Sequence, residues 1–145
     1  MHIKNEIKLE LLAVSRNEAF ARQAVASFVS QLPITVEELS DIKTAVSEAV
    51  TNSIVHGYGE RLGFVTLECR LFDNEKGETI EISIIDSGKG ISDIEKAREP
   101  LYTSQPELER SGMGFTVMET FMDEVSVSSE INRGTKVTLR KTIKG

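Results

Sequence analysis

Three residues near the middle of the chain, Asp86, Gly88 and Gly90, combine a carboxylate with two glycines directly after an isoleucine-rich segment. Glycines let a backbone come close to a flat ligand, and an aspartate at such a place can accept a hydrogen bond from an exocyclic amine such as that of adenine. Taken alone, the pattern fits equally well a simple turn with a solvated aspartate. It therefore indicates a candidate nucleotide site that needs support from the rest of the chain.

A second pair of glycines, Gly112 and Gly114, comes just before residues 115–122, which have helical periodicity. The free N–H groups and the positive end of a helix dipole at such a place favour phosphate oxygens. The pair is also typical of an ordinary turn at a helix start. No third glycine follows and no Gly-Lys-Ser/Thr occurs, so the dinucleotide fingerprint and the Walker loop are both excluded.

Glu48 and Asn52 are four residues apart in another segment with helical periodicity, which makes them neighbours on one helix face. Their oxygen atoms suit Mg²⁺, which prefers one or two protein oxygens together with phosphates and water. A carboxylate beside such an ion can also take a proton from a hydroxyl group. By itself the pair favours an ordinary solvated helix face, so it becomes a candidate site only together with the other motifs.

The joint order of these features resembles the ATPase and kinase superfamily of type II topoisomerases, ninety-kilodalton heat-shock chaperones, sensor histidine kinases and mismatch-repair ATPases. Residues 47–58 and 106–115 look more specifically like the bacterial anti-sigma serine kinases of sporulation. The resemblance runs from about residue 3 to residue 142. It implies a Bergerat-type ATP-binding fold, ATP or ADP and Mg²⁺ as ligands, and an ATP lid at approximately 91–111.

The resemblance also implies roles for individual residues in phosphate transfer. Asn52 would bind the Mg²⁺ that bridges the ATP phosphates, and Glu48 would be the base for the attacking serine hydroxyl. Arg110 would meet the γ-phosphate and stabilise the charge that develops during transfer. Gly112 and Gly114 would let the lid close on the phosphates.

Other residues are implied in binding adenine and protein partners. Asp86 would receive the adenine amino group, Gly88 and Gly90 would shape the wall beside it, and Thr135 would touch the adenine side. Arg22 matches a position that the family uses to contact both the sigma factor and the anti-anti-sigma protein. Without the resemblance, Arg22 would be interpreted as a solvated helix residue.

The function implied is an anti-sigma factor that binds and inhibits a sporulation sigma factor of the sigma F type. As an ATP-dependent serine kinase it would phosphorylate and inactivate its anti-anti-sigma antagonist. A homodimer is the family expectation, with the N-terminal strand as a possible contact edge. Two alternatives stay open: an anti-sigma kinase of the general stress response, and a nucleotide-gated protein-binding module without phosphate transfer. The catalytic domain of a sensor histidine kinase is disfavoured, because the only histidines are His2 and His56 and no histidine-bearing helical hairpin is expected before the domain.

Hydrophobic periodicity predicts the elements that position these residues. The predicted strands are 3–12, 64–72, 79–86, 124–130 and 135–142, and the predicted helices begin at capping boxes 15–18 and 35–38 and at residue 115. Pro33 is expected to end the first helix, and residues 57–59 the second. Because two hairpins interrupt the helices, the order predicts an α+β fold, a two-layer α/β sandwich with a mixed, mostly antiparallel sheet and helices on one face.

The buried faces of the first two helices follow from the same periodicity. On the first helix the predicted buried residues are Phe20, Ala24, Val25, Phe28, Val29 and Leu32, and on the second they are Leu39, Ile42, Val46, Ala49 and Val50.

Composition limits the classes of protein that remain. The 145 residues carry 23 Asp and Glu against 17 Lys and Arg, a net charge of −6, and one cysteine. This length predicts a single domain, 1–145. Basic side chains are not clustered and no apolar run approaches the ~20 residues that span a bilayer, so neither direct nucleic-acid binding nor a membrane location is expected. A single cysteine fits a reducing compartment, and a cytoplasmic location is expected.

Overall fold

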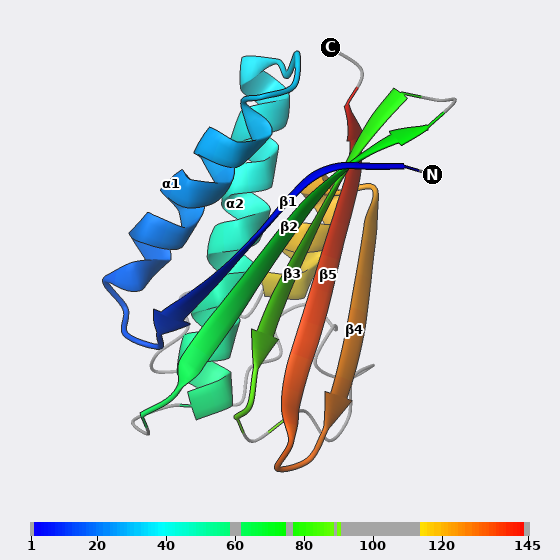
Figure 1. Ribbon diagram of the computed structural model, residues 1–145. Coiled ribbons are helices and arrows are strands. Elements are labelled where there is room, and N and C mark those ends of the chain that lie inside the picture. Colours follow the sequence, from blue (N-terminus) through cyan, green and yellow to red (C-terminus); the bar gives the residue numbers. More distant parts are fainter. Residues whose placement is uncertain (1, 59–61, 75–76, 89, 91–113, 144–145) are drawn as a thin grey trace.

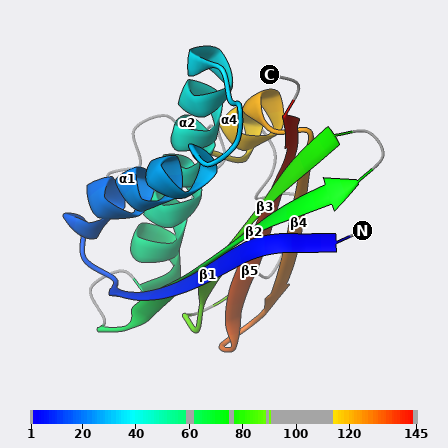
Figure 2. The same ribbon diagram turned by 45° about the horizontal axis from the view of Figure 1, so that its top comes forward.

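The computed structural model of the chain describes residues 2–58, 62–74, 77–88, 90 and 114–143. The elements in chain order are β1 (His2–Leu12), α1 (Asn17–Val29), α2 (Val36–Asn52), the π-helical segment η1 (Ser53–Tyr58), β2 (Phe64–Asn74), β3 (Gly77–Asp86), α4 (Gly114–Phe121), β4 (Glu124–Glu130) and β5 (Gly134–Ile143). The helices cover one face of the sheet and leave the other face open (Figure 1 and Figure 2). The expected α+β sandwich with helices on one face is confirmed.

The strand order in the sheet is β1-β2-β3-β5-β4, and every neighbouring pair is antiparallel. The mixed sheet expected from the sequence is therefore antiparallel throughout the described strands. Both β1 and β4 do run parallel to β3, but an antiparallel neighbour separates each of them from it. The central position of β3 brings its C-terminal residue, Asp86, next to β5 and close to the end of α2.

The alternation of side chains along β3 separates two environments. Ile80, Ile82 and Ile84 are fully buried beneath the helices, whereas Glu81 and Ser83 lie between them on the open face. The other large core residues that are fully buried are Val25, Val29, Ile42, Val46, Val50, Leu67, Leu71, Met118 and Leu139. Cys69 also belongs to this core, and burial raises the pKa of its thiol to about 12.

The start of α2 follows the sequence prediction closely. The Thr35 hydroxyl accepts from the Glu38 N–H at 3.0 Å, and the Glu38 carboxylate accepts from the Thr35 N–H at 3.1 Å. This capping box satisfies two N–H groups that would otherwise lack partners at the helix start. The residues of α2 that are buried are Ile42, Ala45, Val46, Ala49 and Val50, so all the predicted core positions except Leu39, which is partly buried, are confirmed.

The predicted capping box at 15–18 is wrong. The N-cap of α1 is Arg16, and no side chain caps it. The Glu18 carboxylate instead accepts a hydrogen bond from the Thr51 hydroxyl on α2, at 2.7 Å. The Glu18 side chain, which the local pattern assigned to the cap, therefore connects α1 with α2 instead.

The predicted buried face of α1 is only partly right. Phe20 is 54% exposed, while the buried residues are Ala21, Val25, Ala26, Phe28 and Val29. A spacing of four residues advances 400° around a helix and so drifts by about 40° at each step, which carries Phe20 away from the face of Phe28. The helix also ends at Val29, before Pro33.

The helical course that begins with α2 ends at Tyr58, within the predicted 57–59, but its last part is not α-helical. After Asn52 the chain continues as the π-helical segment η1, up to Tyr58. Such segments are rare and cannot be read from a 3.6-residue period. The predicted lid, 91–111, lies outside the described residues, as do Arg110 and Gly112. Among the helices of the described ranges, none combines the length and the apolar character needed to cross a membrane.

Candidate functional site

The carboxylate of Asp86 is the centre of the predicted adenine side. Asp86 is 5% exposed and is the last residue of β3. Its carboxylate accepts hydrogen bonds from the Gly88 N–H, at 3.0 Å, the Ser53 hydroxyl and the Thr135 N–H. Burial raises the pKa of Asp86, and these three bonds lower it by less. Each of the three donors is neutral, so they orient the carboxylate without cancelling its charge.

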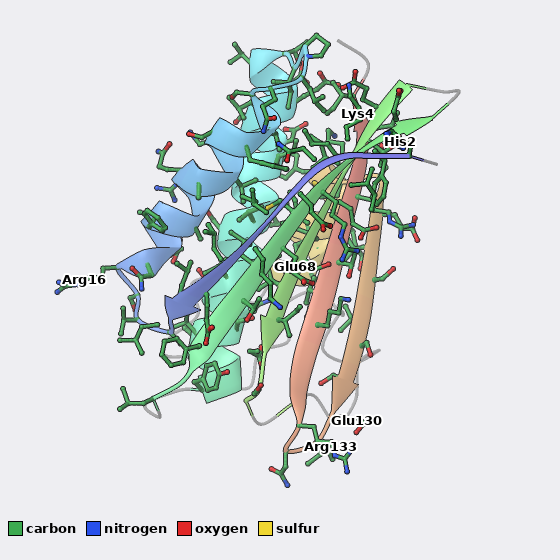
Figure 3. All side chains as sticks on the ribbon, viewed as in Figure 1. His2, Lys4, Arg16, Glu68, Glu130 and Arg133 are labelled. Carbon is green, nitrogen blue, oxygen red and sulfur yellow. The ribbon has the colours of Figure 1, made fainter. Side chains whose placement is uncertain are left out.

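Two glycines allow the β4–β5 hairpin to pack against the turn that follows Asp86. Gly90 has φ +76°, and a Cβ there would overlap the carbonyl of Glu130. Gly134 has φ +107°, and a Cβ there would overlap the carbonyl of Asp86. Figure 3 shows Glu130 at the tip of this hairpin, at the end of the sheet to which β3 points. The close approach made possible by Gly90 is therefore to this protein's own backbone.

Thr135 joins the same cluster by two different groups. Its backbone lies opposite Asp86 in the β3–β5 register, and its hydroxyl forms a hydrogen bond with the Ser129 hydroxyl at 2.8 Å. The structure thus brings together Asp86, Gly88, Gly90 and Thr135, which the sequence had placed up to 49 residues apart.

The predicted phosphate side lies on α2. Glu48 and Asn52 are both partly buried, and Asn52 lies one helical turn after Glu48. Asn52 is the last residue of α2, and the next residue, Ser53, donates to Asp86. One peptide bond therefore connects the residue predicted to bind Mg²⁺ with the residue that holds the predicted adenine acceptor.

Glu48 also lines an open groove of about 410 Å³ between α1 and α2. Arg22 lines the same groove, and its guanidinium donates to the Ser47 hydroxyl at 3.2 Å. Glu18, one turn before Arg22, is bonded to Thr51 as described above. The residue predicted to bind partners and the residue predicted to act as a base therefore share one surface.

The start of α4 supplies the last described part of the site. Gly114 is its first residue and is buried, and α4 packs against α2. Within residues 2–58, 62–74, 77–88, 90 and 114–143, no group of three or more His, Cys, Asp or Glu side chains could hold a metal ion. The amide oxygen of Asn52 still fits Mg²⁺, because this ion keeps water and phosphate oxygens for most of its coordination sphere.

Two hydroxyl groups that the sequence analysis did not select complete the contacts of this region. They are those of Ser53, bonded to Asp86, and of Tyr58, which accepts from the Ser87 N–H and donates to the Phe64 carbonyl, both at 2.7 Å. The position of Tyr58 depends on the π-helical segment, for which the sequence carries no periodic signal.

Comparison with known proteins identifies related sequences over nearly the whole chain. Residues 13–141 match the histidine kinase-like ATPase domain family. An anti-sigma F factor of Clostridium novyi (strain NT) is 56% identical over 141 residues, which are 97% of this chain and 96% of that protein. An anti-sigma F factor of Oceanobacillus iheyensis is 59% identical over 142 residues, covering 97% of this chain and 94% of that protein.

A solved structure supports the fold independently of close sequence similarity. The crystal structure of the RsbU and RsbW domains of a Mycobacterium tuberculosis protein matches with a TM-score of 0.64 and 18% sequence identity. The match covers 97% of this chain and 32% of that one.

Proposed function

Because the chain belongs to the histidine kinase-like ATPase family, and within it to the anti-sigma F factors, we propose that it binds ATP between α2 and the end of β3. It uses ATP to phosphorylate a serine of an anti-anti-sigma protein. It also binds a sigma factor of the F type and holds it inactive until the unphosphorylated anti-anti-sigma protein competes. It acts in the cytoplasm as a homodimer.

The buried carboxylate of Asp86 is the observation that carries the nucleotide site. A buried carboxylate held only by neutral donors retains lone pairs that can accept a further hydrogen bond. The exocyclic amine of adenine is such a donor. The backbone N–H groups of Gly88 and Thr135 both donate to the carboxylate, and Gly90 fixes the turn against the hairpin.

The phosphates lie toward Asn52 and Glu48. Asn52 would hold Mg²⁺ through its amide oxygen, and the ion would supply positive charge beside the phosphates. Glu48 accepts the proton of the attacking serine hydroxyl. The serine oxygen forms a bond to the γ-phosphorus as the bond from that phosphorus to the β,γ-bridging oxygen breaks, and ADP leaves with the electron pair.

Arg110 of the predicted lid and the two glycines that follow it complete the transfer site in this proposal. Arg110 stabilises the charge on the transferred phosphoryl group. Gly112 and Gly114 allow the backbone to come close to the phosphates, where the first N–H groups of α4 add positive potential.

Binding of ATP is tested with Asp86→Asn and the control Glu81→Gln, which changes another buried carboxylate of β3. The Kd for Mg·ATP is measured by isothermal titration calorimetry. We expect about 10- to 100-fold weaker binding by Asp86→Asn, since a charged hydrogen-bond acceptor is lost, and no change by Glu81→Gln. Equal affinity of wild type and Asp86→Asn would remove the adenine assignment.

Phosphate transfer is tested with labelled ATP and a serine-bearing anti-anti-sigma protein. Glu48→Gln is expected to lower the transfer rate at least 100-fold while ATP binding is kept. A wild-type protein that binds ATP but labels no partner would instead be a nucleotide-gated binding module.

The partner surface is tested with Arg22→Ala and the control Arg16→Ala. Both residues are on or next to α1, but Figure 3 shows Arg16 pointing away from the protein. We expect Arg22→Ala to weaken sigma-factor binding at least tenfold and Arg16→Ala to leave it unchanged. Co-purification of a general stress sigma factor in place of the sporulation type would change the assignment of the partner.

A further inference from the structure

The six residues of the π-helical segment η1 connect the two sides of the candidate nucleotide site. It begins directly after Asn52 and ends at Tyr58. A π-helical turn holds one residue more than an α-helical turn, and such turns are frequent at functional sites. Here the first and the last residue of the segment both form hydrogen bonds to the Asp86 region.

The first of these residues is Ser53, which is 4% exposed. Its hydroxyl donates to the Asp86 carboxylate. A hydroxyl in this position occupies one lone pair of the carboxylate and so limits the directions from which a ligand can donate. Ser53 is also bonded covalently to Asn52, so the orientation of Asp86 is linked to the end of α2.

The last residue is Tyr58, which is 8% exposed. Its ring packs so closely on Gly63 that a Cβ at Gly63 would overlap it. Its hydroxyl accepts from the Ser87 N–H at 2.7 Å and donates to the Phe64 carbonyl at 2.7 Å. The hydroxyl thus ties the residue after Asp86 to the first residue of β2.

We propose that Ser53 and Tyr58 are positioning residues for recognition of the nucleotide base. Ser53 orients the carboxylate of Asp86, and Tyr58 holds the turn after it, so that the free oxygen lone pairs face an incoming amine. This role rests on the proposed adenine site. It predicts that the two hydroxyls determine base selectivity, because adenine presents an amine where guanine presents a carbonyl oxygen, which a carboxylate repels.

The test uses Tyr58→Phe and Ser53→Ala, which remove only the hydroxyls, with Ser83→Ala as the control. Ser83 is a buried serine of the same strand as Asp86, 4% exposed, whose hydroxyl bonds to Thr138 on the open face. Thermal unfolding confirms that each variant is folded. The Kd values for Mg·ATP and Mg·GTP, and the kcat and KM of phosphate transfer, are then compared.

We expect Tyr58→Phe and Ser53→Ala each to weaken ATP binding by three- to tenfold, with GTP binding unchanged. The KM for ATP should rise by the same factor while kcat at saturating ATP stays constant. Ser83→Ala should change none of these values. An unchanged ratio of ATP to GTP affinity in both variants would overturn the proposal, as would a fall in kcat with KM constant. If Tyr58→Phe does not fold, Ser53→Ala decides alone.

Asp86→Asn separates this proposal from the proposed function. Weaker ATP binding by Asp86→Asn together with unchanged selectivity in Ser53→Ala and Tyr58→Phe would reject only the positioning role. Unchanged ATP binding by Asp86→Asn would reject the adenine site itself.

Discussion

Two carboxylates of β3 are buried to nearly the same extent, yet the protein stabilises them in different ways. Glu81, 8% exposed, lies on the open face between two arginines. Arg140 contacts its Oε2 atom through Nε at 2.7 Å and through Nη2 at 2.6 Å, and Arg70 lies 3.6 Å from its Oε1 atom. Asp86, 5% exposed, has only neutral donors among the contacts described above.

The two arginines that contact Glu81 belong to a row of alternating charges across the open face. This charge row consists of Glu6, Arg70, Glu81, Arg140 and Glu124. Glu6 pairs with Arg70 at 3.0 Å, and Arg140 lies 3.9 Å from Glu124. The row has one residue on each strand, in direct cross-strand register. Opposite charges on neighbouring strands stabilise a sheet and favour this register.

The difference shows how a structural acid can be told from an acid kept for a ligand. The charge of Glu81 is matched by two arginines, which compensate for the water that its carboxylate loses on burial. A ligand would therefore gain little by binding to it. For Asp86, the hydrogen bonds compensate only in part for the hydration that the charged carboxylate loses on burial, as its raised pKa indicates. A ligand that donates a hydrogen bond can recover that cost, which is why perturbed acids cluster at functional sites.

The largest effect is expected from Glu81→Gln. The substitution keeps the shape of the side chain but leaves both arginines without their central partner. We expect the free energy of unfolding to fall by about 2 kcal/mol, measured by urea denaturation. ATP affinity should not change. Weaker ATP binding with unchanged stability would mean that the two acids have been assigned to the wrong roles.

A smaller effect is expected from the arginines, and it should be unequal. Arg140→Met removes two short contacts to buried Glu81 and one long contact to exposed Glu124. Arg70→Met removes one long contact to Glu81 and a 3.0 Å contact to exposed Glu6. We expect losses of about 1.5 and about 0.5 kcal/mol. The same urea titration measures both, and methionine retains much of the apolar stem in each variant. Equal losses would contradict a dominant role for Arg140.

The pH dependence of stability tests Asp86 directly. Because its pKa is raised in the folded state, the folded protein binds a proton more readily than the unfolded chain does. The associated stabilisation is present below the ordinary carboxyl pKa and is lost as the pH rises through the raised value. Wild type should therefore gain stability relative to Asp86→Asn as the pH falls through that window. A difference that stays constant with pH would show that Asp86 has an ordinary pKa.

Much of the fold could be predicted from local pattern. Alternation located all five strands, and the capping box at Thr35 located the start of α2. The misplaced Phe20 comes from the drift of a four-residue spacing around a helix. The failed cap at Glu18 and the charge row, which was not predicted, depend instead on contacts between distant segments. Glu18 bonds to Thr51 on another helix instead of capping its own, and the row through Glu81 needs a register between strands that are far apart in the sequence.

The candidate site divides in the same way. The motif around Asp86 and the pair Glu48 and Asn52 are local, and the sequence identified them as candidates. Ser53 was missed because its partner, Asp86, lies on a distant strand. Tyr58 was missed because its hydroxyl reaches the Ser87 N–H through the π-helical segment. A helix of regular period would direct the Tyr58 side chain elsewhere.

The smallest effect is expected at the end of the charge row. Glu124 is 59% exposed at its side chain and lies 3.9 Å from Arg140, so water and salt screen the pair. Glu124→Gln should lower the free energy of unfolding by less than about 0.5 kcal/mol at low salt, and the loss should vanish at 1 M NaCl. The loss from Glu81→Gln should persist at that salt concentration, because a buried pair is screened much less. If both losses vanish at 1 M NaCl, salt screens the ion pairs of Glu81 as fully as the pair of Glu124. The contrast between Glu81 and Asp86 would then depend only on their different effects on ATP binding.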